Sequence, residues 1–276
     1  MRAIITGSKG FIGKAFSKAT QDIFEQQILI EKDILEGDWR KTLRHQFLDP
    51  PEAVFHFGAC SDTLSKDSKD MLLKNVIFTN YLADLCHFFG VPFIYSSSAS
   101  VYGKNQFSVK KQDSSLSLYA NSKLIGEQYA LKCEGIALRY FNVYGYDESH
   151  KGNMASIAYQ SYRKHIKGQN VFLFKGKPLR DFVYVKDVIS ANLYAFENYN
   201  YLRGDFYDVG SGTPRLFEDV LNCMGIPFSY YDVYARVPQH YQFYTKATKF
   251  MEGWIPEWPL EYGLVEYLDI LVNGHN

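Results

Sequence analysis

A tyrosine and a lysine four residues apart, in Tyr119-Ala-Asn-Ser-Lys123, form the clearest chemical pair in the sequence. On a helix, residues four apart lie on one face within reach of each other. A free tyrosine keeps its proton until about pH 10, and a cation a few ångströms away favours the phenolate. The pair therefore indicates a proton-transfer catalyst. On spacing alone, an ordinary surface helix with an unrelated tyrosine and lysine is the better explanation.

A glycine-rich turn near the N-terminus gives the second chemical signal. It follows the apolar run Arg2 to Thr6 and opens a helical pattern. Glycines at such a turn let the backbone approach a pyrophosphate, and the helix N-terminus favours the anion. The spacing is GxxGxxG and differs from the GxGxxG of the common dehydrogenases. We expect a dinucleotide here, in contact with Gly7, Gly10, Phe11, Ile12 and Gly13.

The end of the second apolar run offers both an acid and a base, Glu31 and Lys32. An acid at this position usually bonds the adenosine ribose hydroxyls of NAD, whereas a base tolerates the extra phosphate of NADP. Because the chain has both residues, the choice between NADP and NAD stays open at this point.

Short apolar runs alternate with longer helical patterns through the first two hundred residues, which predicts an α/β fold with a doubly wound parallel sheet. The runs are RAIIT, QILIE, AVFHF, PFIYSS and IALRYF. Between the third and fourth runs, Met71 to Phe89 has helical spacing and stops at Gly90. From about Tyr146 the pattern loosens, which indicates a smaller lobe interwoven with the first. We expect one domain over 1–145 and 180–212, and the other over 146–179 and 213–276.

Composition excludes several classes of protein. Thirty basic residues balance thirty acidic ones among 276, so no general attraction for nucleic acid or anionic membranes is expected. A signal peptide and a membrane-spanning apolar run are both missing from the sequence, which predicts a cytoplasmic protein. Four widely spaced cysteines without a CxxC pair argue against a disulfide framework and a zinc site, and we predict no bound metal.

Several motifs together resemble the extended short-chain dehydrogenase/reductase family, which acts on nucleotide sugars and has a Rossmann sheet. They are GSKGFIG at 7–13, SSSASVYG at 96–103 and YANSK at 119–123. Within the family, the likeness is closest to the ADP-glyceromanno-heptose 6-epimerases. The further matching stretches, in the family's order over almost the whole chain, are HFGACSDT, PFIYSSSASVYG, RYFNVYG with SHKGNMAS, RDFVYVKDV and HYQFYTKA.

The resemblance implies four catalytic residues. Ser98 would hydrogen-bond the reacting hydroxyl or ketone, and Tyr119 would act as acid or base. Lys123 would hold the nicotinamide ribose and lower the tyrosine pKa. Inversion through NAD(P) removes a hydride from a carbinol carbon, turns the ketone over and returns the hydride to its other face, so a second acid/base is useful. Lys151, in the HKG loop specific to this epimerase type, would fill that role if partly desolvated.

The resemblance also implies two sets of binding residues. Besides the glycine turn, Glu31 and Lys32, the cofactor would contact Phe57, Gly58, Ala59, Asn75, Tyr119, Lys123, Val143 and Lys151. The substrate would contact Ser98, Asn142, Asn153, Gln160, Phe174, Lys175, Gly176, Arg180 and Tyr241. Arginine suits a bidentate grip on diphosphate. We expect one tightly bound NADP, or alternatively NAD, per subunit of a homo-oligomer, and a nucleotide-diphosphate sugar substrate bound by the second lobe.

Some residues depart from the family pattern. Asn153 and Gln160 stand where the heptose epimerases usually have serine and histidine, and Lys175 replaces a glutamate, so an altered substrate is compatible with the sequence. Family members that dehydrate sugars carry an Asp-Glu pair after the catalytic hydroxyl residue. This chain has Ala99 and Ser100 there, which disfavours dehydration.

We therefore predict a nucleotide-sugar epimerase, either an ADP-glycero-manno-heptose 6-epimerase or a variant acting on a related nucleotide heptose. One alternative is a nucleotide-sugar 4-epimerase or reductase in which Lys151 is incidental. A more remote alternative is a non-catalytic dinucleotide-binding sensor. His56 is expected to be a core histidine, and the adjacent Asp147 and Glu148 are expected to lie in a solvated loop.

Overall fold

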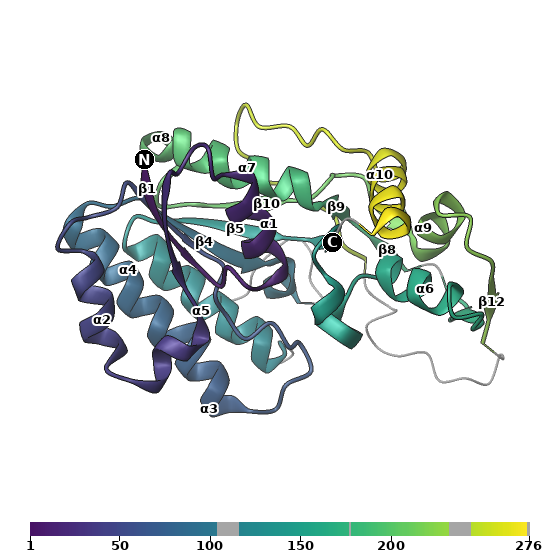
Figure 1. Ribbon diagram of the computed structural model, residues 1–276, viewed down its shortest axis with the longest axis horizontal. Coiled ribbons are helices and arrows are strands. Elements are labelled where there is room, and N and C mark those ends of the chain that lie inside the picture. Colours follow the sequence, from purple (N-terminus) through teal and green to yellow (C-terminus); the bar gives the residue numbers. More distant parts are fainter. Residues whose placement is uncertain (104–115, 177, 232–243, 275–276) are drawn as a thin grey trace. The chain divides into compact units, whose positions relative to one another are not determined.

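The computed structural model describes residues 1–103, 116–176, 178–231 and 244–274 (Figure 1). The chain divides into two compact units. The first holds Met1–Tyr140, Ile189–Asp208 and Met251–Trp254, and the second holds Phe141–Val188, Val209–Phe250 and Ile255–Asn276. This division differs from the expected one at 180–188 because β8 and β9 pair with strands of the second unit. Smaller differences occur at 141–145, 209–212 and 251–254.

A six-stranded sheet forms the centre of the first unit, in the order β10-β5-β4-β3-β1-β2. Its strands are β1 (Arg2–Thr6), β2 (Gln26–Ile30), β3 (Ala53–His56), β4 (Phe93–Ser98), β5 (Ile136–Tyr140) and β10 (Phe206–Val209). The pairings from β2 to β5 are parallel. The N–H of Ala137 donates to Asp205 and that of Phe141 to Val209, so β10 also runs parallel to β5. The doubly wound parallel sheet predicted from the sequence is confirmed.

Helices cover both faces of this sheet. They are α1 (Phe11–Ala19), α2 (Trp39–Gln46), α3 (Ser68–Met71), α4 (Phe78–Phe89), α5 (Leu118–Lys132), α7 (Val185–Glu197) and α8 (Tyr199–Leu202), with the short 3-10 turns η1 (Lys32–Glu36) and η3 (Ala99–Tyr102). Helix α7 begins in the second unit and continues in the first. Among the described residues, no helix combines the length and apolar character needed to cross a membrane.

Alternation along β3 assigns a set of helices to each face, because successive strand side chains point to opposite sides. Phe55 contacts Phe16 of α1 and Phe196 of α7, with ring centroids 4.4 and 6.0 Å away. Its neighbour Val54 belongs instead to a buried cluster with Leu43 of α2 and residues of α4 and α5. Figure 1 shows α2, α4 and α5 side by side beneath the sheet.

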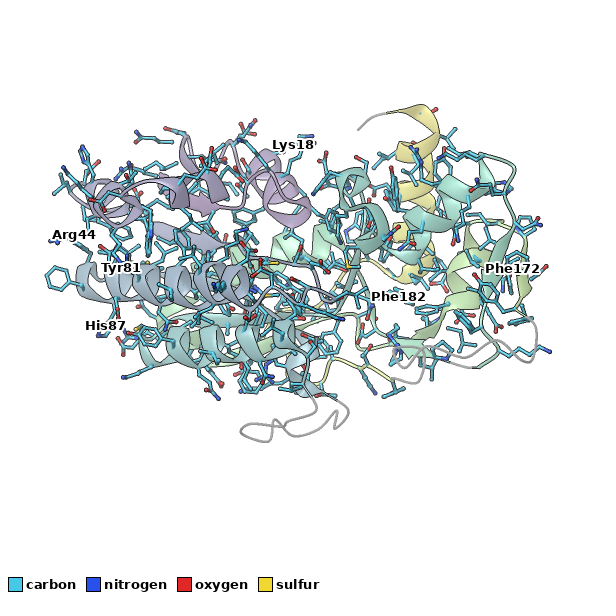
Figure 2. The ribbon with its side chains drawn as sticks, turned by 90° about the horizontal axis from the view of Figure 1, so that it is seen from below. Lys18, Arg44, Tyr81, His87, Phe172 and Phe182 are labelled. Carbon is cyan, nitrogen blue, oxygen red and sulfur yellow. The ribbon has the colours of Figure 1, made fainter. Side chains whose placement is uncertain are left out.

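The helical segment expected from Met71 to Phe89 begins differently from an ordinary α-helix. Between α3 and α4, Leu72–Ile77 forms a π-helix, η2, which has i→i+5 hydrogen bonds. Such wider turns often occur at functional sites. Helix α4, which carries Tyr81 and His87 (Figure 2), ends at Gly90 with φ of 66°, and this confirms the predicted stop.

A buried ion pair fastens α5 to the sheet. Glu127 of α5 accepts hydrogen bonds from Arg139 of β5, with Nη2–Oε1 at 2.5 Å and Nε–Oε2 at 2.9 Å, and both side chains are 2% exposed. Ser97 of β4 donates to the same carboxylate at 2.5 Å. Ser97 precedes Ser98, and Glu127 lies one turn after Lys123, so this contact fixes α5 against the end of β4.

The described residues of the second unit form three small sheets, each of two strands. Strand β6 (Asn142–Tyr144) pairs with β9 (Phe182–Tyr184), β7 (Val171–Leu173) with β12 (Phe228–Tyr230), and β8 (Leu179–Arg180) with β11 (Arg215–Leu216). The first two pairs are parallel and the third is antiparallel. Its helices are η4 (Ser149–Met154), α6 (Ile157–His165), α9 (Phe217–Cys223) and α10 (Leu260–Asn273).

A buried carboxylate accepts hydrogen bonds from backbone N–H groups that lie outside the ladders of these small sheets. Asp181 accepts the N–H groups of Ser211, Gly212 and Ala247 at 2.6, 2.9 and 2.8 Å. Its own N–H donates to the hydroxyl of Thr245 at 3.0 Å. One side chain thus connects segments on both sides of residues 232–243, which lie outside the described part of the chain.

Replacing Glu127 by Gln is expected to lower the free energy of unfolding by about 3–5 kcal/mol, because Arg139 would keep a buried charge without its carboxylate partner. Urea denaturation measures this loss. The control is Arg203→Gln, which removes the exposed pair with Glu134, whose side chains are 48% and 53% exposed. It should cost less than about 1 kcal/mol. Equal losses in the two variants would contradict the importance of the buried pair.

Candidate active site

The glycine turn brings β1, β3 and α1 closer together than any side chain permits. A Cβ on Gly7, whose φ is 68°, would lie 2.7 Å from Cα of Gly58, and one on Gly13 would lie 2.2 Å from the carbonyl oxygen of Gly7. Helix α1 begins after Gly10 without a side-chain cap, so its first N–H groups remain suited to an anion. This backbone cradle fits the pyrophosphate of a dinucleotide.

Glu31, which directly follows β2, lies against the same turn. One oxygen of its carboxylate accepts the hydroxyl of Ser8 at 2.5 Å and the N–H of Lys9 at 2.8 Å. The acidic candidate for the adenosine ribose is therefore held in place by the glycine turn itself. The side chain of Lys32, the basic candidate, lies outside the described part of the structure.

His56 supports the adjoining turn from within the core. Its ring nitrogens lie 2.6 Å from the hydroxyl of Thr6 and 2.8 Å from that of Thr79. The same Thr6 hydroxyl accepts the N–H of Gly58 at 2.9 Å. Burial, with a smaller effect from the charge of Lys123, lowers the pKa of His56 to about 3. His56 is thus a neutral core residue, as the sequence predicted.

Asn75, in the π-helix η2, is fully buried behind the loop that follows β3. Its side chain accepts the N–H of Cys60 at 2.7 Å and donates to the carbonyl oxygen of Cys60 at 3.1 Å and to Ser122 at 2.9 Å. Asn75 therefore shapes the partly exposed loop of Phe57, Gly58 and Ala59 from behind. This corrects the direct cofactor contact expected from the sequence, because no surface of Asn75 is exposed.

Ser98, Tyr119 and Lys123 come together in the first unit. Ser98 ends β4 and is hydrogen-bonded to Tyr119. Tyr119 and Lys123 lie one turn apart on α5, which is capped by the Ser117 side chain. The Lys123 Nζ donates to the carbonyl oxygen of Ser96 at 2.7 Å. The sequence therefore predicted that these three side chains lie together, but it did not predict that the Lys123 side chain points toward Ser96.

The electrostatics of this group differ from the expectation. Burial raises the pKa of Tyr119, which the hydrogen bond with Ser98 opposes and the nearby Cys60 reinforces. Burial also lowers the pKa of Lys123 to about 7, against a smaller opposing effect of Cys60. The expected lowering of the Tyr119 pKa by Lys123 is therefore wrong for this arrangement. The Lys123 Nζ is turned toward the carbonyl oxygen of Ser96.

Lys151 lies in η4 of the second unit, where its N–H donates to the Glu148 carbonyl at 3.0 Å. Burial lowers the pKa of Lys151, and Glu148 opposes this shift. The partial desolvation that a proton-donating lysine needs is thus present. Asp147 and Glu148, expected in a solvated loop, are instead 5% and 0% exposed. That expectation is wrong because donors distant in sequence surround the Glu148 carboxylate.

Two of the predicted substrate residues, Asn153 and Gln160, take part in hydrogen bonds that hold the Lys151 loop, Ser149–Met154. Gln160 of α6 donates to the carbonyl oxygens of Asn153 and Ala155 at 3.2 and 2.7 Å. Asn153 itself is exposed on η4. The Gln160 amide group therefore holds the loop, and the structure assigns it a supporting contact that the sequence did not suggest.

The remaining predicted residues of the second unit are spread over three strands. Exposed Asn142 opens β6, with partly buried Val143 after it. Phe174 follows β7 and lies against Tyr231, with ring centroids 4.5 Å apart. Buried Arg180 of β8 places its guanidinium 5.6 Å from the ring centroid of Phe217. Lys175 and Gly176 lie in an exposed bend, and Tyr241 lies outside the described residues.

Comparison with known proteins decides the family. Residues 3–210 match the model of the NAD dependent epimerase/dehydratase family. The chain belongs to this family. The ADP-L-glycero-D-manno-heptose-6-epimerase of Brachyspira hyodysenteriae is 32% identical over 254 residues, which cover 80% of this chain and 79% of that protein. The resemblance drawn from the motifs is confirmed, together with the dependence on NAD(P).

Solved structures of epimerases share the whole fold. The ADP-L-glycero-D-manno-heptose-6-epimerase of Helicobacter pylori has a TM-score of 0.83 and 25% identity, over 99% of this chain and 96% of that one. The UDP-glucose 4-epimerase of Thermotoga maritima, solved with UDP-glucose, has a TM-score of 0.82 and 22% identity over all of both chains. The second likeness supports the fold of this epimerase/dehydratase family member.

Changing Glu31 to Gln is expected to raise the affinity for NADP relative to NAD by about tenfold, because the carboxylate charge would repel a 2′-phosphate and bonds a ribose hydroxyl better than an amide does. Titration of cofactor-stripped protein with each dinucleotide measures the ratio. Glu36→Gln, an exposed change in η1, is the control. A ratio that stays constant in Glu31→Gln would show that this carboxylate does not face the adenosine ribose.

The stabilisation that His56 provides is expected to decrease as the pH is lowered. Because its folded pKa is below the ordinary value of 6.5, the unfolded chain binds a proton that the folded chain excludes, and stability is lost between about pH 6.5 and 3. The difference in unfolding free energy between wild type and His56→Gln should therefore shrink from pH 7 to pH 4 in urea titrations. A constant difference would argue against a neutral His56. The exposed His45→Gln is the control.

Proposed function

We propose that the chain is a nucleotide-sugar epimerase that inverts a carbinol carbon through NAD(P), with ADP-glycero-manno-heptose or a related nucleotide heptose as substrate. One observation carries the proposal. Ser98, Tyr119 and Lys123 are grouped in the unit that holds the glycine cradle, and the other unit presents a desolvated Lys151. The heptose epimerase named for the Brachyspira relative supports the choice of sugar.

Residues of the first unit would handle the first proton. Bound NAD(P) supplies the chemistry of accepting a hydride and giving it back. The hydroxyls of Ser98 and Tyr119 would bind the oxygen on the reacting carbon, and Tyr119 would take its proton during oxidation. Since burial raises the Tyr119 pKa, Lys123 would have to turn from Ser96 toward the phenol and be protonated to stabilise the phenolate. Glu31, Ser8 and the glycine turn would hold the dinucleotide.

Lys151 would handle the proton on the opposite face of the turned ketone. An ordinary lysine has a pKa of about 10.4 and gives up its proton reluctantly at neutral pH. The lowered pKa of Lys151 makes that transfer easier. Two proton handlers on separate units suit a reaction in which the substrate oxygen changes position between the two hydride transfers.

The second unit would bind the nucleotide diphosphate. Arg180 would bind phosphate oxygens through its guanidinium, and the exposed Lys175 would add positive charge. The paired rings of Phe174 and Tyr231 provide an apolar surface for a base. We further propose a cytoplasmic homo-oligomer, which the exposed apolar side chains Phe88 and Ile125 support.

The direct test begins with release and identification of the bound cofactor. The protein is then incubated with ADP-heptose, GDP-heptose and UDP-glucose, and the configuration at each sugar carbon is followed by NMR. Inversion at C6 of ADP-heptose is the expected result. Inversion of UDP-glucose at C4 alone would instead establish the 4-epimerase alternative. A protein that binds NAD(P) and changes none of a wider panel of nucleotide sugars would be a sensor.

Tyr119→Phe and Lys151→Met are each expected to lower kcat by at least about 100-fold, because each removes one of the two proton handlers. Dinucleotide titration should show that both variants still bind cofactor. Lys164→Met, which changes an exposed lysine of α6, is the matched control. If Lys151→Met retained nearly full turnover, a 4-epimerase or reductase with an incidental Lys151 would be the better description.

A further inference from the structure

The carboxylate of Glu148 forms the best-connected polar centre near Lys151. Its Oε2 accepts the N–H of Ser156 at 2.6 Å, and its Oε1 accepts the hydroxyls of Ser156 and Tyr267 at 2.6 and 2.9 Å. The N–H of Gly145 lies 3.5 Å from Oε1. These donors come from both sides of η4 and from helix α10. A side chain three residues before Lys151 is therefore fixed by distant parts of the second unit.

This arrangement fastens both ends of the Lys151 loop to one residue. At the start of η4, the carbonyl oxygen of Glu148 accepts the N–H of Lys151 at 3.0 Å. At its far end, Ser156 bonds the Glu148 carboxylate and also caps α6 by accepting the N–H of Tyr159 at 3.2 Å. Gly152, with φ of 53° and ψ of −122°, allows the sharp change of direction between the two ends.

Glu148 is also a charge that acts on Lys151. The other titratable groups around this centre are Asp147 and His150 on the loop, Tyr159 on α6, Tyr184 on β9 and Tyr267 on α10. Burial raises the pKa of both Tyr184 and Tyr267, so these phenols remain neutral donors. Glu148 raises the Lys151 pKa against the lowering by burial. Its carboxylate therefore opposes the loss of the lysine's proton.

We propose that Glu148 is a positioning residue for Lys151, whose buried carboxylate joins the two ends of the Ser149–Met154 loop and holds the lysine in the field of its negative charge. The consequence for turnover rests on the proposed function. The anchoring of the loop does not, because it follows from the hydrogen bonds of Glu148 within the second unit.

The experiment compares wild type with Glu148→Gln, which is nearly isosteric but uncharged. Amine acylation with acetic anhydride is measured across pH, and the peptide containing Lys151 is quantified by mass spectrometry. The midpoint of Lys151 reactivity is expected to move down by about one pH unit in Glu148→Gln, because a nearby opposite charge is lost. Glu148→Asp keeps the charge and should retain the wild-type midpoint. An unchanged midpoint in a folded Glu148→Gln overturns the proposal.

Ser156→Ala separates charge from anchoring. It removes the hydroxyl bonded to Glu148 and the α6 cap but leaves the carboxylate, so thermal stability should fall while the Lys151 midpoint does not move down. Should Glu148→Gln fail to fold, Tyr267→Phe replaces it in the same measurement. Loss of the phenol donor leaves more charge on the carboxylate, so the midpoint should rise, and an unchanged midpoint overturns the proposal.

Turnover distinguishes this inference from the proposed function. If wild type inverts a nucleotide sugar, the pH profile of kcat in Glu148→Gln should move down with the labelling midpoint, whereas a merely structural defect would lower kcat without moving the profile. If wild type is inactive with every sugar, the proposed function fails, and the labelling midpoints still decide the role of Glu148.

Discussion

Buried backbone N–H groups need hydrogen-bond acceptors, and this requirement determines how the second unit is held together. An N–H left unpaired inside a protein costs about 1–3 kcal/mol, and two-stranded sheets of two or three residues satisfy few of them. Carboxylates take over that function. Asp181 binds three amides, and Asp187 binds those of Glu257 and Trp258 at 2.8 and 3.2 Å. Burial raises the pKa of Asp187 to about 6, which shows that these anchors are held at some electrostatic cost.

The first unit meets the same requirement with its parallel ladder, which leaves side chains at the strand ends for other contacts. Thr6 and His56, at the ends of β1 and β3, support the two turns at the glycine cradle. Ser98 ends β4 beside the helix that carries Tyr119 and Lys123. Since Glu127 fastens that helix to β5 through Arg139, the spacing between Ser98 and Tyr119 depends on this buried pair.

Local patterns in the sequence predicted the features that depend on residues close together in the chain. The alternating apolar runs gave the order of strands and helices, and the spacing of Tyr119 and Lys123 placed both on one helical face. The setting of Glu148 was out of reach, because one of its donors, Tyr267, lies 119 residues further along the chain. Periodicity identifies a buried face but not which distant hydroxyl will meet a carboxylate. Glu127 could have been noticed, since it repeats the spacing of four after Lys123 on the same face.

The π-helix η2 makes the number of residues in this segment as important as their identity. A turn of this kind holds more residues than the 3.6 of an α-helix, so removal of one residue between Leu72 and Ile77 would restore α-helical winding. Everything on one side of the deletion would then rotate by about 100° relative to the other. Either Asn75 would leave Cys60 and Ser122, or the apolar stripe of α4 would turn away from the sheet. The segment can therefore exchange side chains far more readily than it can change length.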